Sequence, residues 1–362
     1  VRKFMKLFKS LLVAPATLGL LAPMSATANE VTISDFNAAE EIAVTNSRID
    51  GLESRFNNLE AGSFSETTTA SFGSTFYVGS VENSATGEAV TFSYDFGMDL
   101  STSFTGEDSL DVAIIGGDAG TTAVDGFMGG DMATVDVEGT TVNTPDALVL
   151  DGVSYTFPLG GATVIVGDGV GVDDLNTGAC AYSAFTDLLS DCGANNLGGS
   201  ADSGFAIAYD FDNGFTLAGG AAGGTSTDGL FTEEDASTLG VEAAYTADTY
   251  GVSVAYTDDE ATTFWTVNAM ITPEGFPSIS VGYETDDDDA DAIFAGLTFD
   301  EVGPGSVSIG MASTATDADD FYQYELSYSY PLNDGMTITP GVFIAETAGD
   351  DETGVVVTTS FS

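Results

Sequence analysis

Carboxylates are the side chains of this sequence with the widest scope for chemistry, because they are abundant and have few basic counterparts. The 362 residues include 57 Asp and Glu, six Lys and Arg, and no His. All six basic residues lie at or before Arg55, so every later position is neutral or acidic. Clustered carboxylates can attract cations, ligate Ca²⁺ or Mg²⁺, or hydrolyse glycosides in pairs.

The scarcity of basic side chains excludes several classes of function. Nucleic-acid binding needs cationic side chains that neutralise phosphates, so we expect no nucleic-acid partner. Ser-His-Asp catalysis and histidine-ligated zinc both need His, and a Walker-type phosphate loop needs the Lys that is missing after the glycines at 219–224. No pair of acids stands out from the acidic background as a glycosidase pair would. The sequence therefore predicts that the protein is not an enzyme and has no catalytic cofactor.

Short acidic runs recur in the second half of the chain, at residues 258–260, 286–291, 317–320 and 350–352. The densest run contains Asp286, Asp287, Asp288 and Asp289, which are candidate Ca²⁺ or Mg²⁺ ligands. The run matches neither the EF-hand loop nor the calcium-binding nonapeptide repeat, so a solvated external loop is the alternative. As a metal site, it would hold structural Ca²⁺ or Mg²⁺ between external loops and lipopolysaccharide or neighbouring subunits.

Cys180 and Cys192 are the two cysteines of the chain, and both lie in the long connection 168–203. Outside the inner membrane, two nearby cysteines are expected to form a disulfide. The bond would close a short loop and stiffen it, as a lid or as a constriction folded into a pore.

A regular alternation of apolar with small or polar residues must position these side chains. Tyr322, Tyr324 and Leu326 alternate with Gln323 and Glu325, which is the period of a β-strand with two unlike faces. Sixteen such strands are expected, starting near residues 68, 88, 109, 147, 161, 204, 214, 238, 249, 262, 277, 291, 305, 321, 336 and 353. Tight turns alternate with acidic or long connections, as in a transmembrane antiparallel β-barrel with short periplasmic turns and long external loops.

Acids inside the predicted strands all lie on the polar face. They are Asp95, Asp99, Asp111, Glu242 and Glu325. A carboxylate that faces lipid is costly, whereas one that faces a watery lumen is not, so these five are candidate pore-lining residues. Because no basic residue follows Arg55, such a pore would prefer cations. Tyr residues near the strand ends are typical of an interfacial aromatic girdle, although cross-strand aromatic pairs in a soluble sheet would give a similar pattern.

The N-terminal region reads differently. Residues 1–28 combine a basic head, a short apolar core and Ala26-Thr27-Ala28, which predicts a signal peptide. Within residues 29–62, Ile42, Ile49 and Phe56 are seven apart, which predicts a short periplasmic coiled coil that would make the protein a homotrimer. An amphipathic helix packed on its own barrel is the alternative. The barrel domain is expected over residues 63–362.

Several stretches together carry a resemblance to a known family. They are Arg48-Ile-Asp-Gly-Leu-Glu-Ser-Arg55, Phe64-Ser-Glu-Thr-Thr-Thr69, the leader from Met5 to Ala16, residues 150–167, and the C-terminal stretch Gly354-Val-Val-Val-Thr-Thr-Ser-Phe361. Their order resembles the cyanobacterial outer-membrane porins of the OprB-type, a carbohydrate-selective and iron-uptake group. Such porins usually carry an S-layer-homology domain before the heptad helix, whereas this sequence has only residues 29–38 there.

The resemblance implies passive transport of small hydrophilic solutes, such as carbohydrates and inorganic ions, across the cell outer membrane. Together with the residue pattern, it predicts an all-β barrel porin in contact with outer-membrane lipid and lipopolysaccharide. The alternative is a secreted acidic all-β module of the cell surface or S-layer, bound through divalent cations.

Overall fold

The computed structural model describes residues 68–84, 88–118, 123–128, 134–136, 141–143, 145–193, 203–223, 231, 236–288, 290–315, 320–346 and 351–362. The predicted signal peptide at 1–28 and the heptad helix within 29–62 lie outside these residues. No helix among the described residues is long and apolar enough to cross a membrane.

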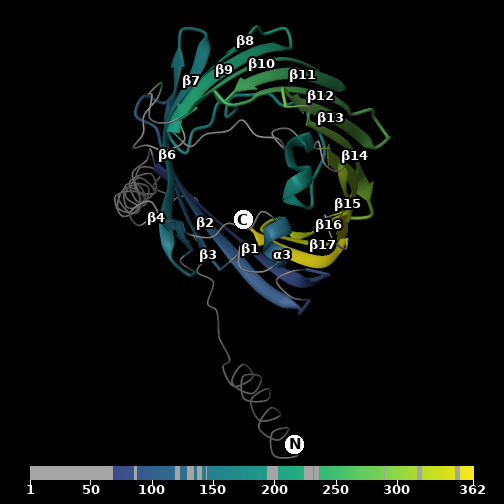
Figure 1. Ribbon diagram of the computed structural model, residues 1–362. Coiled ribbons are helices and arrows are strands. Elements are labelled where there is room, and N and C mark those ends of the chain that lie inside the picture. Colours follow the sequence, from purple (N-terminus) through teal and green to yellow (C-terminus); the bar gives the residue numbers. More distant parts are fainter. Residues whose placement is uncertain are drawn as a thin grey trace, which may run out of the picture. The chain divides into compact units, whose positions relative to one another are not determined.

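In the described part of the chain, sixteen antiparallel strands close into one barrel (Figure 1). The strands are β1 (Thr68–Glu82), β2 (Thr91–Thr102), β3 (Ser109–Gly117), β6 (Leu148–Leu159), β7 (Ala162–Asp168), β8 (Ser203–Asp210), β9 (Phe215–Gly223), β10 (Ser237–Ala247), β11 (Tyr250–Asp258), β12 (Thr263–Ile271), β13 (Ser278–Asp286), β14 (Asp291–Val302), β15 (Gly305–Ala315), β16 (Asp320–Asn333), β17 (Met336–Ala345) and β18 (Glu352–Phe361). Each begins within three residues of its predicted start, so the predicted fold class and strand count are confirmed.

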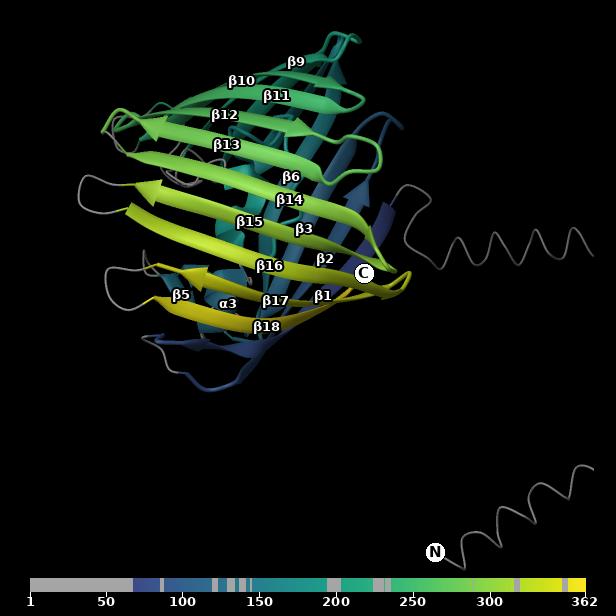
Figure 2. The ribbon, with the colours of Figure 1, turned by 90° about the vertical axis from the view of Figure 1, so that its right-hand side faces the viewer.

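Neighbouring strands pair in sequence order, and the first and last strands close the barrel. β1 pairs with β18 from Ser74 opposite Phe361 to Glu82 opposite Thr353. β3 pairs with β6 across the long connection between them. Because each of these strands is hydrogen-bonded to a neighbour on both sides, the barrel leaves no open sheet edge among them. Figure 2 shows the strands crossing the barrel with a common tilt.

Turn residues explain why the chain reverses sharply at one end of the barrel. Between β8 and β9, Asp212 and Gly214 both have positive φ, and the Asn213 side chain accepts a hydrogen bond from the Phe215 amide. Between β2 and β3, Asp108 accepts hydrogen bonds from the Tyr155 hydroxyl and the Thr105 amide. These hydrogen bonds, the Tyr155 bond first, lower the pKa of the Asp108 carboxyl well below its ordinary value.

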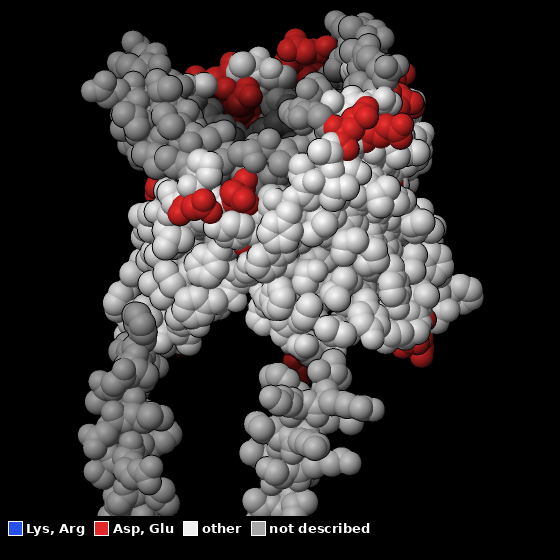
Figure 3. All heavy atoms as spheres, turned by 90° about the horizontal axis from the view of Figure 1, so that it is seen from below, with Lys and Arg blue, Asp and Glu red and all other residues white. Residues whose placement is uncertain are grey.

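The outer face of the barrel is apolar and exposed. On β10, Leu239 and Val241 point outward with 46% and 54% of their surface exposed, whereas Glu242 points inward and is 3% exposed. Trp265 on β12 is 52% exposed on the same outer face. Figure 3 shows a broad band nearly free of charged residues, with acidic side chains mostly at one end and a few at the other. This is the surface that a transmembrane barrel presents to hydrocarbon.

Described parts of two long connections lie inside the barrel. The connection from β3 to β6 contains helix α3 (Ala123–Met128) and the hairpin β4 (Thr134–Asp136) with β5 (Thr141–Asn143). The connection from β7 to β8 contains the 3₁₀ helix η2 (Asp187–Gly193), and we call its described part, residues 169–193, the inner loop. Both α3 and η2 lie inside the ring of strands in Figure 1, where α3 contacts β1 and η2 contacts β13, β14 and β15.

Candidate pore constriction

A row of glycines on the barrel wall makes space for the inner loop. Six strands each contribute one inward-facing glycine to this row: Gly220, Gly240, Gly282, Gly296, Gly310 and Gly341. A Cβ atom at any of them would come within 3 Å of an atom of the inner loop. At Gly296 and Gly310 that atom belongs to Tyr182, and at Gly341 it belongs to Phe185. The missing side chains therefore let the loop lie directly against the backbone of the wall.

Glu325 on β16 holds the centre of the inner loop. One carboxylate oxygen accepts hydrogen bonds from the Tyr182 hydroxyl at 2.7 Å and from the Phe185 amide at 2.8 Å. The other oxygen accepts hydrogen bonds from the Thr186 amide at 2.8 Å and from the Thr186 hydroxyl. Glu325 is only 4% exposed, so these donors replace the water that its charge has lost. Burial, and secondly the Glu325 charge, raise the pKa of the Tyr182 phenol well above its ordinary value.

Glu242 on β10 holds the beginning of the loop in the same way. It accepts hydrogen bonds from the Thr177 amide at 2.6 Å and the Gly178 amide at 3.1 Å. Between the two carboxylates, neutral hydroxyls of the wall accept hydrogen bonds from further loop amides. The Ser280 hydroxyl accepts a hydrogen bond from the Ala181 amide at 2.9 Å, and the Thr298 hydroxyl accepts one from the Ser183 amide at 3.2 Å. Side chains of the wall thus accept hydrogen bonds from six backbone amides of the loop between residues 177 and 186.

Cys180 and Cys192 form a disulfide within the inner loop, with their Cα atoms 5.8 Å apart. Cys192 and Leu189 are fully buried and pack with Phe294 and Ala312 of the wall. The disulfide therefore ties the η2 end of the loop to the segment that Glu242 and Glu325 hold. Of the two roles that the sequence left open for this bond, the structure shows the loop folded inward rather than as an external lid.

The five predicted pore-lining acids separate into two groups. Glu242 and Glu325 face inward, but the inner loop covers them and leaves them buried. Asp95, Asp99 and Asp111 lie on the inner face of β2 and β3 and are half-buried or exposed. Asp95 accepts hydrogen bonds from the Thr75 amide and the Tyr77 hydroxyl, and Asp111 accepts one from the Ser109 hydroxyl. Asp99 is exposed.

Sequence reasoning missed the role of the covered acids as acceptors for a loop. A readable signal was present, because the glycines of the wall recur on the polar face of successive strands. By itself, that pattern indicates only a face of small residues. A polar face made of glycine is also what a second layer of chain requires, since it leaves room for backbone contact.

The acidic run between β13 and β14 folds as a turn. Asp286 accepts hydrogen bonds from the Asp288 and Ala290 amides, and Asp287 accepts one from the Thr263 amide. Asp289 lies outside the described residues. Among the residues that are described, no group of three or more His, Cys, Asp or Glu side chains is placed to hold a metal ion.

Comparisons with known proteins support the fold. No protein-family model and no curated protein matches the sequence. Among solved structures, OprB of Pseudomonas putida matches with a TM-score of 0.58 and 10% identity, over 82% of this chain and 94% of that one. OmpT of Vibrio cholerae lacking loop L8 matches with a TM-score of 0.57 and 12% identity, over 82% and 99%. A mutant porin of Rh. blastica matches with a TM-score of 0.55 and 14% identity, over 81% and 99%. The chain therefore has the fold of outer-membrane porins.

Proposed function

We propose that the protein is an outer-membrane porin that conducts small hydrophilic solutes passively and performs no chemistry. The observation that carries this proposal is the inner loop, held against the inner wall of a closed barrel whose outer face is apolar. An apolar outer band needs lipid around it, and a loop folded against the wall narrows a lumen without closing it as a packed core would. The alternative of a secreted surface module predicts a polar outer face, which the exposed apolar residues do not provide.

The same channel is proposed to prefer cations. No Lys, Arg or His follows Arg55, so neither the wall nor the inner loop carries a positive side chain. Asp95, Asp99 and Asp111 lie on the inner face of β2 and β3, and further acids lie mostly at one end of the barrel (Figure 3). Carboxylates at a pore wall favour cations over anions.

We further propose, from the sequence resemblance, membership in the OprB-type group and transport of carbohydrates and inorganic ions including iron. The heptad pattern supports assembly as a homotrimer, and the acidic runs support structural Ca²⁺ or Mg²⁺ at the external loops. Native mass spectrometry in detergent, with and without chelator, measures both the subunit number and the bound metal. A monomer without metal would remove the last two proposals and leave the channel untouched.

Bilayer recordings test the channel and its selectivity together. Purified protein in a planar bilayer should give steady conductance steps, and a KCl gradient should give a reversal potential of cation-selective sign. Changing Asp95, Asp99 and Asp111 together to Asn should move the reversal potential towards zero. The matched control neutralises Asp248, Glu301 and Asp334, which lie at the short turns, and should leave the potential nearly unchanged. Anion selectivity of the wild-type channel would refute the electrostatic assignment, and a folded protein without steps would refute the channel.

A further inference from the structure

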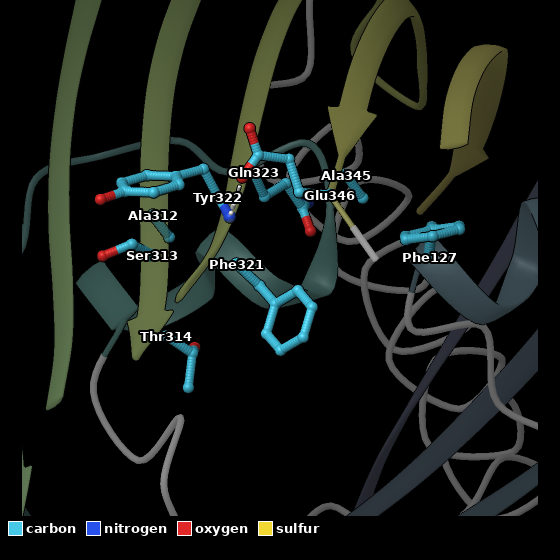
Figure 4. A pocket seen from close by; sticks show the side chains of 9 residues that line it. All are labelled: Phe127, Ala312, Ser313, Thr314, Phe321, Tyr322, Gln323, Ala345 and Glu346. Carbon is cyan, nitrogen blue, oxygen red and sulfur yellow. Dashed lines mark hydrogen bonds between the residues drawn. The ribbon is translucent and has the colours of Figure 1, made fainter. Parts of the chain in front are cut away.

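A small pocket opens on the inner face of the barrel, at the ends of β15, β16 and β17 that carry the acidic connections. Its volume is about 210 Å³, and its lining includes Phe127 of α3, Phe321 and Gln323 of β16, and Glu346, which follows β17. Figure 4 shows Phe127 and Phe321 on opposite sides of the space, with Gln323 and Glu346 beside it. Ala312 and Ala345 complete its apolar wall. A cavity of about 150 Å³ accommodates benzene, so this one has room for a single ring and a short substituent.

Gln323 lines this pocket, and its side chain has one acceptor oxygen without a donor in the described part of the chain. The side chain is 4% exposed, and its amide nitrogen donates to the Thr186 hydroxyl at 2.6 Å. The hydrogen-bond network determines the orientation of the Gln323 amide. The Thr186 hydroxyl donates its proton to Glu325, so it must accept the hydrogen bond from Gln323. The Gln323 carbonyl oxygen therefore points away from Thr186, and it has no hydrogen-bond donor among the described residues. Leaving a buried acceptor without a donor costs free energy.

Glu346 adds a charge at the same place. One of its oxygens accepts a hydrogen bond from the Tyr322 amide at 3.1 Å, and this bond holds the carboxylate at the edge of the pocket. No basic side chain exists anywhere after Arg55 to neutralise it. The rings of Phe127 and Phe321 offer π-faces, which attract cations. The carboxylate and the rings thus favour a ligand that brings a positive charge and a small apolar body.

We propose that this pocket binds small organic ammonium ions with an aromatic or alkyl body. The proposal deepens the proposed function, because it names a solute class that would collect at the mouth of the cation-preferring channel. An organic anion would meet Glu346 without any donor for its own charge. A neutral alcohol could donate one hydrogen bond but would gain nothing from the carboxylate. Discrimination between ammonium and alcohol is therefore the signature of the site.

The first experiment records single channels in a planar bilayer while benzylammonium chloride is added to the side with the long connections. Benzylammonium should block the current at concentrations at least about tenfold lower than benzyl alcohol, which has the same shape without the charge. Benzoate should not block. Equal block by the alcohol and the ammonium ion would overturn the assignment, because it would show an apolar cavity without a role for Glu346.

Two variants with the same change of charge distinguish binding in the pocket from attraction of the cation by the overall negative potential of the channel. Glu346→Gln keeps an acceptor for the Tyr322 amide and should weaken the block by benzylammonium about fivefold, the upper range for one partly exposed ion pair. Glu352→Gln neutralises an acid at the start of β18, at the same end of the barrel, and should leave the block unchanged. Equal effects of the two variants would mean that the field alone concentrates the cation, and the pocket would be rejected.

Calorimetry in detergent decides the question even where no conductance is found. Titration of the folded barrel with benzylammonium should show saturable binding that Glu346→Gln weakens and Glu352→Gln does not. Binding without conductance would remove the porin proposal and keep the site, whereas conductance without block or binding would remove the site and keep the porin.

Discussion

Replacement of Glu325 by Gln tests whether carboxylates hold the inner loop in place. The substitution keeps the size of the side chain but turns one acceptor oxygen into an NH₂ group. Each oxygen accepts two donors, Tyr182 and Phe185 on one side and the two donors of Thr186 on the other. Two donors are therefore left without an acceptor, whichever way the new amide turns.

The size of the effect follows from the hydrogen bonds that are lost. A hydrogen bond to a charged group contributes about 1.5–3 kcal/mol, so losing two should weaken loop docking by about 3–6 kcal/mol. That free energy corresponds to a factor on the order of 10² to 10⁴ in the population of the undocked loop. Barrel strands should be unaffected, because their ladders do not involve this side chain.

Hydrogen exchange read by mass spectrometry in detergent measures this directly. Peptides covering Phe185 and Thr186 should exchange faster in Glu325→Gln by that factor, while peptides from β9 to β12 keep the wild-type rate. Single-channel current should become noisier, since the loop would leave the wall more often. Thr298→Val serves as the control. It removes the acceptor of the Ser183 amide, a neutral bond of about 1 kcal/mol, and should give roughly a fivefold change.

One outcome would refute the reasoning. If Glu325→Gln exchanges at the wild-type rate, or no faster than Thr298→Val, the carboxylate does not hold the loop. Apolar packing of η2 and the disulfide would then account for its position.

Three further predictions concern the loop and the turns. Gly310→Ala would place a methyl group where the inner loop lies and should raise conductance and protease cleavage of the loop, whereas Gly97→Ala on β2, where a Cβ meets nothing within 4 Å, should do neither. Replacing both Cys180 and Cys192 by Ser should lower the stability of the docked loop by about 3 kcal/mol, seen as faster exchange of residues 180–192 with the barrel intact; unchanged exchange would mean that the wall contacts suffice. Because the folded-state pKa of Asp108 is depressed, its stabilising contribution is full above the unfolded-state value near 4 and is lost as pH falls below it. Thermal unfolding of detergent-solubilised protein should therefore show a smaller loss between pH 6 and pH 2 in Asp108→Asn than in the wild type, and equal losses would contradict this.

Much of the barrel could be predicted from the chain because its signals are local. Alternation of apolar and polar residues has the period of the strand itself, so strands such as Asp320–Asn333 are visible without knowledge of their partners. Turn residues such as Gly214 and Gly303 adopt positive φ for reasons contained in a few residues. The pairing of Cys180 with Cys192 needed only their proximity in a chain with no other cysteine.

Only the tertiary structure decided what each inward-facing side chain meets. Asp99 and Glu325 have the same chemistry and the same place in the strand pattern, yet the first is exposed and the second is buried beneath the inner loop. The pocket likewise joins Phe127 to residues about 200 positions later in the chain. The period of a strand says which face a residue occupies. Barrel closure and the path of a long connection determine whether water, a loop amide or another ring lies opposite, and those depend on contacts between distant parts of the chain.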